Sequence, residues 1–367
     1  MTLLVQIAGM FEKLEKALPR VKIDLPALDR WPDMVFSLGP LPLLFLFMAS
    51  SLIMIWRLNA VEEKGFEGTM VGTIVMPFCS GFANLAFALV MAGSKDGGSL
   101  VLENCIVNNV TNLTLVLGIP TLFWGINIAG RKKVPPKKEN KKAAAKEKEK
   151  EKRTEAKISY FSLLLSLIAM LFFTGAVWQL ARDGILDASD GMVLTGLFLF
   201  WQAFHVVDVM KNNVRKSRTV DPSVIGDFVA VGLCAWVTVY SIDGLVVWVT
   251  EQGSGFLSRE NLGLLSGLLM VVPNAMLAFY YSAKGRSDIA YSSQIGDCHI
   301  CIPLCIGVYA IASPITVPAT FELGAGIIMV TGGVLLLFTA LLGRLPRIMG
   351  AVLTLSYSVF LYRGIIS

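Results

Sequence analysis

The sequence predicts an all-α polytopic membrane protein whose ten transmembrane helices form two inverted five-helix repeats, with both termini outside. Three observations lead to this prediction. Charged residues are scarce, ten apolar windows are long enough to cross a bilayer, and two pairs of these windows carry the same features at a nearly constant offset.

Charge density excludes several classes of protein. Of the 367 residues, 54% are hydrophobic and 16% are charged, and the mean hydropathy is +0.65. An average soluble domain has about 25% charged residues. A single run, Arg131 to Lys157, holds 13 basic and 5 acidic residues. The remainder is too apolar for a soluble enzyme, a secreted disulfide scaffold or a disordered chain. From this apolar composition we expect the lipid bilayer as a partner. Because the run also accounts for the net charge of +5, the charge does not indicate nucleic acid as a partner.

Ten apolar windows reach the length of about 20 residues that a helix needs to span a bilayer. They are residues 36–56, 69–93, 99–128, 158–181, 190–210, 223–249, 262–283, 287–311, 323–342 and 346–365. The third and the sixth are long enough to be tilted or broken.

Lysine and arginine are distributed unevenly between the loops. Loops after odd-numbered windows, counted together with Arg347 at the start of the tenth window, hold 23 of them. Loops after even-numbered windows hold only Lys95, Arg182 and Arg259. By the positive-inside rule, the odd-numbered loops face the cytoplasm and both termini lie outside. We expect an integral, multi-pass protein of the plasma (inner) membrane.

This layout divides the chain into four segments. Residues 1–35 form an N-terminal segment in which Leu3 to Leu18 has the spacing of an amphipathic helix on a membrane surface. Residues 36–210 form the first repeat, 211–222 a cytoplasmic loop and 223–367 the second repeat. Within the first repeat, residues 131–157 are interpreted as a solvated cytoplasmic linker that can be helical, and a regulatory or lipid-binding role stays open.

Two polar ladders identify the repeat. Asn104, Asn108 and Asn112 recur at every fourth position, and Ser293, Asp297 and Cys301 repeat that spacing in the second half, each at the same offset from its counterpart. Asn84 precedes the first ladder and Asn274 precedes the second. The sequence distance between these two residues is one position longer than the distance between paired ladder residues. Repeats of five spans have opposite orientations in the membrane, and inverted repeats are typical of secondary transporters with a substrate site near the midplane. Polar residues at this spacing share one helix face and point to other helices, water or ions; simple hydrogen-bonded helix packing is the alternative.

The ladder segments resemble a known family. The run Gly-Arg-Ser-Asp-Ile-Ala-Tyr-Ser-Ser-Gln-Ile-Gly-Asp, from Gly285 to Asp297, resembles the second alpha-repeat of the calcium/cation antiporter superfamily. The run from Glu103 to Gly118 resembles the first alpha-repeat. The best-known members of this superfamily are sodium/calcium exchangers. The resemblance therefore implies a sodium/calcium exchanger-like antiporter that works by alternating access.

The chain departs from the family at the ligand positions. In the family, each repeat has a Gly-Thr-Ser-Leu-Pro-Glu-like segment whose glutamate binds the cation. Asn274 stands at that position in the second repeat, and Asn84 or Leu85 in the first. Further family ligands map onto Asn108, Asn112, Asp297 and Cys301. The usual acidic pair is absent, and Asp297 is the one carboxylate at a family ligand position.

The chemistry of this residue set points to weak or monovalent cation binding. Calcium takes six to eight oxygen ligands, typically including carboxylates. Here the candidates are Asn84, Glu103, Asn108, Asn112, Asn274, Ser293, Asp297 and Cys301. Glu103 lies about 100° around the helix from Asn104. Proline at 77 and 273 can break the second and seventh helices and expose carbonyl groups. We expect no permanently bound cofactor, only transported cations, with calcium and sodium suspected.

Other interpretations stay open. Cys298, His299, Cys301 and Cys305 are soft ligands that suit zinc or copper, although no tetrahedral ligand spacing is present. The same fold can carry an antiporter coupled to protons, potassium or a transition metal. A membrane scaffold or sensor with a degenerate repeat is the alternative outside transport. No phosphate loop, HExxH or nucleophile motif is present, so we expect no enzyme.

Overall fold

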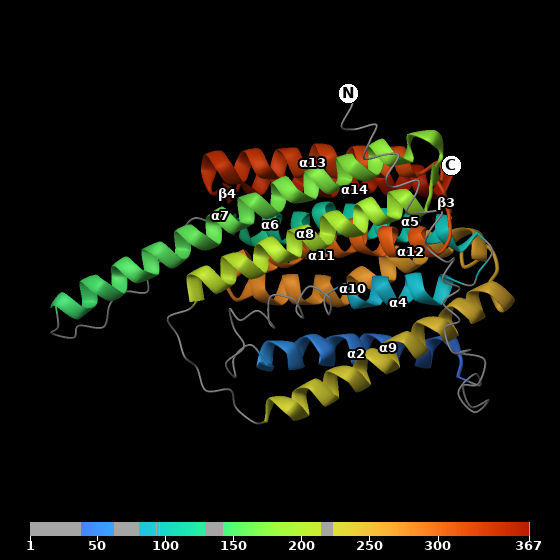
Figure 1. Cartoon of the computed structure of the whole chain (residues 1–367), viewed down its shortest axis with the longest axis horizontal. Coiled ribbons are helices and arrows are strands. Elements are labelled where there is room, and N and C mark those ends of the chain that lie inside the picture. Colours follow the sequence, from blue (N-terminus) through green and yellow to red (C-terminus); the bar gives the residue numbers. More distant parts are fainter. Residues whose placement is uncertain are drawn as a thin grey trace. The chain divides into compact units, whose positions relative to one another are not determined.

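The computed structural model describes residues 38–61, 81–92, 94, 96–128, 142–213 and 223–366 (Figure 1). Three predicted features lie outside these residues: the amphipathic segment 1–35, the first part of the charged linker, 131–141, and residues 214–222 of the central loop. The same holds for Pro77.

Helices account for almost all of the described secondary structure. They are α2 Pro40–Val61, α4 Phe82–Met91, α5 Gly97–Thr111, α6 Leu117–Trp124, α7 Lys142–Leu180, α8 Ala188–Asn213, α9 Val224–Gln252, α10 Leu262–Ala283, α11 Ser287–His299, α12 Ile306–Ala312, α13 Phe321–Leu342 and α14 Arg347–Ile366. Two π-helical segments join them, η3 Asn112–Val116 and η6 Ile300–Cys305, together with two 3₁₀ turns, η4 Ala181–Asp183 and η5 Arg259–Asn261. Because α7 begins at Lys142, the part of the charged linker from that residue onward is helical.

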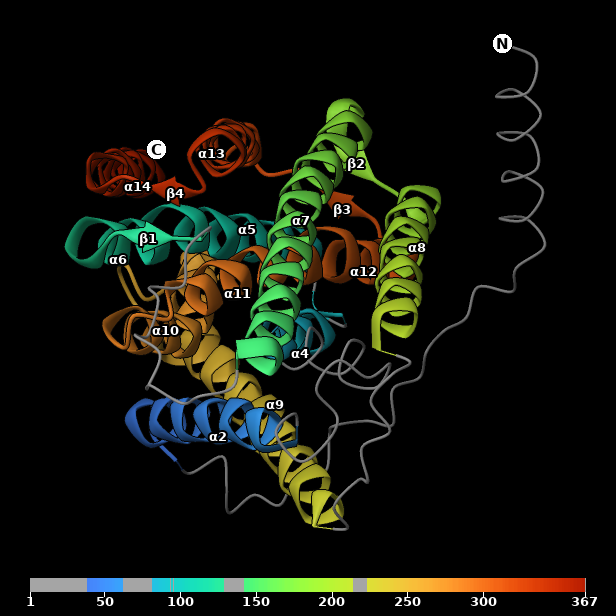
Figure 2. The same cartoon turned by 90° about the vertical axis from the view of Figure 1, so that its left-hand side faces the viewer.

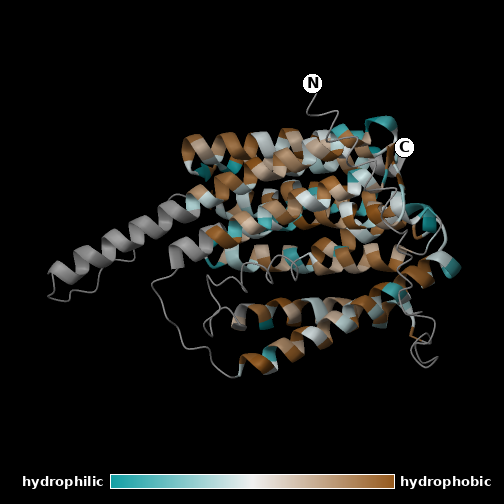
Figure 3. Cartoon of the chain, in the orientation of Figure 1, coloured by the Kyte–Doolittle hydropathy of each residue, from teal (hydrophilic) through white to brown (hydrophobic). Residues whose placement is uncertain are grey.

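Eight helical segments of the described chain are long and apolar enough to cross a membrane. They are Pro40–Leu58, Gly97–Trp124, Tyr160–Asp183, Ala188–Val207, Val224–Gln252, Arg259–Ala283, Ile289–Ala312 and Phe321–Leu342. Hydrophobic residues run along most of the length of these helices (Figure 3). The protein is therefore an all-α polytopic membrane protein, as the sequence predicts.

Two helices continue where the sequence suggested a possible break. The sixth window forms one helix, α9, and α10 continues through Pro273. A proline removes one backbone donor, and inside a membrane protein neighbouring groups can satisfy the carbonyl that it frees. The third window is not broken either, but its helix passes through the π-helical segment η3.

The chain folds into two compact units, and each takes segments from both halves of the sequence. Unit 1 comprises Met1–Asn108, Ala176–Pro273 and Ile300–Phe321, and unit 2 comprises Asn109–Gly175, Asn274–His299 and Glu322–Ser367. The elements of each predicted repeat are thus distributed over both units.

In unit 1, α2 packs along α9 (Figures 1 and 2). Polar contacts accompany this packing: the Ser50 and Thr238 hydroxyls are hydrogen-bonded at 2.9 Å, and Arg57 Nη1 lies 3.3 Å from Asp227 Oδ1. A carboxylate within or near hydrocarbon needs such a partner. This pair therefore ties one end of α2 to the first turn of α9.

A glycine contact joins α8 to α12 in unit 1. A Cβ atom added at Gly307 would lie 2.7 Å from Thr195 Oγ1, and one at Gly191 would lie 2.6 Å from the Gly307 carbonyl oxygen. Small residues at such positions let membrane helices approach closely. Beside this contact, Ile185–Leu186 (β2) pairs antiparallel with Ile315–Thr316 (β3) (Figure 2).

Unit 2 contains the counterpart of this contact between α6 and α14. A Cβ atom at Gly118 would lie 2.8 Å from Thr354 Oγ1, and one at Gly350 would lie 2.6 Å from the Gly118 carbonyl oxygen. Ile126–Asn127 (β1) pairs antiparallel with Arg344–Leu345 (β4) beside it (Figure 2).

The two glycine contacts are related by the repeat. Gly118 and Gly307 are separated by the same offset as the paired residues of the polar ladders. Gly350 and Thr354 follow Gly191 and Thr195 at a second offset, which is the same for both pairs. In both units, the third helix of one repeat therefore packs against the last helix of the other through the same pair of glycines and a threonine.

Replacing Gly350 by alanine is expected to destabilise the protein by about 1–3 kcal/mol, because the added methyl group meets the backbone of Leu122 and Gly118. Thermal unfolding of the detergent-purified protein measures this. Gly326→Ala in α13 is the matched control, since a Cβ atom there has no neighbour within 4 Å. Equal unfolding temperatures for the two variants would contradict close packing at Gly350.

Candidate cation site

The polar ladders run into the two π-helical segments. Asn112 begins η3, and Cys301 lies at the equivalent position in η6. The Leu117 N–H reaches back to the Asn112 carbonyl, five positions away, and Pro303 inside η6 has no N–H to continue an α-helical pattern. π-helical turns are rare and occur frequently at functional sites. The two π-helical segments therefore make these positions in both helices candidates for a functional site.

In unit 2, three predicted residues meet around one carboxylate oxygen. Asn112 Nδ2 donates a hydrogen bond to Asp297 Oδ2 at 2.7 Å, and Asn274 Nδ2 donates to the same oxygen at 3.1 Å. All three residues are buried: Asn112 is 0% exposed, Asn274 is 4% exposed and Asp297 is 1% exposed. Hydrogen bonds to a carboxylate are stronger than those between neutral groups. We call this set, which joins η3, α10 and α11, the Asp297 cluster.

In unit 1, Asn108 Nδ2 donates to Cys301 Sγ at 2.9 Å. At the constant offset of the repeat, Asn108 is the counterpart of Asp297, and Asn112 is the counterpart of Cys301. The contact between Asn108 and Cys301 is thus the repeat equivalent of the contact between Asp297 and Asn112. Of the two pairs, only the one in unit 2 includes an acidic side chain.

Buried amide groups without protein partners are the second feature of the site. Asn84 is 1% exposed, and neither of its amide atoms has a hydrogen-bond partner within the described part of the chain. Within those same residues, the amide oxygens of Asn104 in unit 1 and Asn112 in unit 2 also have none. Buried polar groups are normally paired, and exceptions indicate an ion, a water molecule or a catalytic role. Within its own unit, each of these oxygens is therefore a candidate ligand for an ion or a water molecule.

Two predicted residues do not join these clusters. The Glu103 side chain lies against Gly263 in the first turn of α10, where an added Cβ atom would overlap its carboxylate. The neighbouring Asn104 Nδ2 donates a hydrogen bond to Ser266 Oγ, which also belongs to α10, at 3.0 Å. Ser293 is half-buried on α11, and the hydrogen bonds of the Asp297 cluster do not reach it. Glu103 and Asn104 thus hold α5 against α10 in unit 1.

Sequence reasoning missed two buried amides in unit 2. Asn109 Nδ2 donates to the Cys298 carbonyl at 3.4 Å, and its oxygen has no partner among the described residues. Gln294 is fully buried, and neither atom of its side-chain amide has a partner there. Gln294 precedes Asp297 by three positions and so shares its helix face. That spacing was the signal available in the sequence.

The soft-ligand cluster suggested by the sequence does not come together. Cys298 donates to the Gln294 carbonyl at 3.3 Å, and His299 Nε2 lies 2.9 Å from the Ser166 carbonyl, both within unit 2. Cys301 and Cys305 belong to unit 1. In the described chain, no group of three or more His, Cys, Asp or Glu side chains is arranged to hold a metal ion.

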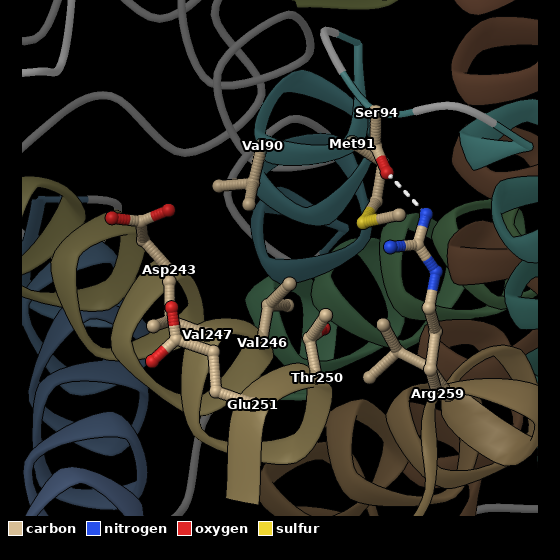
Figure 4. A pocket seen from close by; sticks show the side chains of 10 residues that line it. Val90, Met91, Ser94, Asp243, Val246, Val247, Thr250, Glu251 and Arg259 are labelled. Carbon is tan, nitrogen blue, oxygen red and sulfur yellow. Dashed lines mark hydrogen bonds between the residues drawn. The ribbon is translucent and has the colours of Figure 1, made fainter.

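A cavity of about 290 Å³ lies elsewhere in unit 1, between the ends of α4 and α9 and the start of α10 (Figure 4). Asp243 and Glu251 line it from α9, and Arg259 donates to Ser94 Oγ at 3.1 Å at its other edge. None of the ladder residues lines this cavity.

Comparison with known proteins gives the class of this protein. The family model described as "Sodium/calcium exchanger protein" matches residues 39–207 and 227–365, which is most of the chain. The chain belongs to this family, within the calcium/cation antiporter superfamily. It is accordingly a multi-pass cation antiporter rather than an enzyme. A search of curated protein sequences finds no match.

Solved structures of the sodium–calcium exchanger NCX_Mj share the fold. The form soaked with 2.5 mM Na⁺ and 1 mM Sr²⁺ matches with a TM-score of 0.61 and 16% identity, over 88% of this chain and 96% of the exchanger. The form soaked without Na⁺ and Ca²⁺ matches with a TM-score of 0.58 and 14% identity, over 88% and 98% of the two chains. At this identity, the likeness concerns the fold.

Proposed function

We propose that the protein is a secondary active antiporter that works by alternating access, with the Asp297 cluster as part of its cation site. The observation that carries this proposal is a carboxylate buried in an apolar span and held by two amides, Asn112 and Asn274. Ionisable groups inside membrane spans are costly and mark ion pathways. In a cation antiporter, such a group is the first candidate for binding the cargo.

The proposed topology is ten spans arranged as two inverted repeats, with both termini outside the plasma (inner) membrane. The matching glycine contacts of α8 with α12 and of α6 with α14 support the repeat. The excess of lysine and arginine in the odd-numbered loops supports the orientation. The charged linker 131–157 then lies in the cytoplasm.

The ligand chemistry favours a monovalent cation or a weakly held divalent one. Tight calcium sites combine several carboxylates to offset the cost of dehydration. Here Asp297 supplies one negative charge, and the remaining candidates in unit 2 are the amides of Asn109, Asn112, Asn274 and Gln294. The family suggests sodium and calcium as the exchanged ions; proton, potassium or transition-metal coupling is the alternative.

The hydrogen bonds of the Asp297 cluster suggest how a cation enters it. Asn112 and Asn274 present N–H groups to Asp297 Oδ2, whereas a cation on that oxygen needs oxygen ligands. Turning each amide over replaces its N–H groups by its carbonyl oxygen. Among the described residues, the Asn112 oxygen has no hydrogen bond to lose in this turn. We infer that both amides donate to Asp297 when the site is empty and ligate the cation when it is filled.

Asp297→Asn is expected to abolish ion-driven transport, because it removes the one charge of the Asp297 cluster while conserving its size. The measurement is flux into proteoliposomes, with calcium, sodium, potassium, magnesium, zinc and manganese tested under sodium or proton gradients. Glu322→Gln, at an exposed position in the first turn of α13, is the control and should retain flux. Unchanged flux in Asp297→Asn would refute the proposed site. A wild-type protein without any gradient-driven flux would favour the scaffold or sensor alternative.

Changing Asn274 to aspartate should shift selectivity toward divalent cations. A second carboxylate 3.1 Å from Asp297 Oδ2 repels it when the site is empty and joins it when a divalent ion binds. We expect the ratio of calcium to sodium affinity, measured as competition in the flux assay, to rise about tenfold, which corresponds to ~1.4 kcal/mol. Asn274→Ala is the matched control and should weaken binding of both ions. An unchanged ratio in Asn274→Asp would show that Asn274 does not face the cargo.

A further inference from the structure

We propose that Gln294 is a further ligand of the cation in the proposed site, to which it contributes an uncharged amide oxygen. This inference rests on the proposed function, because it adds a residue to the Asp297 cluster. All the residues on which it depends belong to unit 2.

Gln294 is buried without a hydrogen bond from its side chain. The residue is 0% exposed, and neither Nε2 nor Oε1 has a partner within the described part of the chain. A buried polar group without a partner costs free energy, and in a native protein it indicates an ion, a water molecule or a functional role. The folded chain therefore leaves both atoms of this amide available to a bound species.

The other buried polar side chains described on α11 do have partners. Tyr291, one turn before Gln294, is hydrogen-bonded through its hydroxyl to Thr339 Oγ1 at 2.9 Å. The remaining ones are hydrogen-bonded as well: Ser287, Asp297, Cys298 and His299. Loose packing along the helix would leave several of these groups unpaired. Within the described part of α11, the unpaired amide is thus specific to position 294.

The spacing along α11 places this amide beside the Asp297 cluster. Residues three apart in a helix are neighbours on one face, with roughly 5–6 Å between their Cβ atoms. Gln294 and Asp297 are related in this way. The long glutamine side chain can therefore bring its amide to a cation that is bound to the Asp297 carboxylate.

The chemistry of the amide suits this role. Its carbonyl oxygen is the type of ligand that hard cations such as calcium take. It also adds no charge that must stay buried in the membrane when no cation is bound. Since the side chain has no hydrogen bond among the described residues, turning its oxygen toward a cation breaks none. Gln294 thus supplements the single negative charge of Asp297.

A ligand and a structural glutamine respond differently to the loss of the amide. Gln294→Met conserves the length and the unbranched shape of the side chain and removes both polar atoms. Replacing an unpaired buried polar group by an apolar group of similar shape is nearly neutral or stabilising. We expect the cation-free variant to unfold at the wild-type temperature or above it. A glutamine held by the protein or by a structural water molecule would make this variant less stable.

Thermal unfolding of the detergent-purified full chain tests the inference without a transport assay. The protein is unfolded in choline chloride and then with choline replaced by sodium or calcium at equal ionic strength. A bound cation raises the unfolding temperature, and the dependence on its concentration gives an apparent dissociation constant. In Gln294→Met, we expect this constant to rise about tenfold, because one ligand of a charged species is lost.

Tyr291→Phe is the matched control. It removes a buried hydroxyl that has a protein partner, one turn away on the same helix face. This variant should therefore unfold at a lower temperature while its apparent dissociation constant stays unchanged. A lower unfolding temperature of cation-free Gln294→Met, or an unchanged dissociation constant in that variant, would overturn the inference.

Asp297→Asn separates this inference from the proposed function. A cation-induced shift that is lost in Asp297→Asn but unchanged in Gln294→Met refutes Gln294 as a ligand and leaves the proposed site intact. A shift that persists in Asp297→Asn, or that is absent from the wild type, refutes the site itself and with it the inference.

Discussion

Hydrocarbon offers no hydrogen bonds to a buried carboxylate, so Asp297 depends on the side chains that surround it. Asn112 and Asn274 meet this requirement at 2.7 and 3.1 Å. These residues come from η3, α10 and α11, so the site exists only while unit 2 holds these segments together. The contact of α6 with α14 through Gly118 and Gly350 continues directly from η3, and it holds that end of the ladder helix in place.

The repeat explains why the chain contains two versions of one contact. Asp297 with Asn112 and Asn108 with Cys301 occupy equivalent positions, one charged and one neutral. The same backbone arrangement thus supports two different side-chain chemistries. The pair in unit 2 includes a carboxylate, whereas the pair in unit 1 joins an amide to a thiol.

The fold is shared with NCX_Mj at 16% identity, which leaves most side chains different. A fold does not determine which ion is carried, because selectivity resides in the side chains at the site. The resemblance found in the sequence puts Asn274, and Asn84 or Leu85, where the family pattern has glutamates. A site with fewer carboxylates costs less free energy when no cation is bound, because fewer charges are buried in the membrane. It also attracts a divalent ion less strongly. For the proposed site, this lower charge affects both the empty and the filled state.

The sequence by itself determined the membrane class, the helical windows, the constant offset between the two ladders and most of the ladder residues, because hydropathy and helical spacing are local properties. It predicted Asp297, Asn112 and Asn274 as candidates but not the hydrogen bonds between them. Only the tertiary structure decided that Glu103 lies against α10, that Cys298 and His299 bond to separate backbone carbonyls, and that the short strands pair. These outcomes depend on contacts between segments far apart in the chain, and local periodicity carries no information about such contacts.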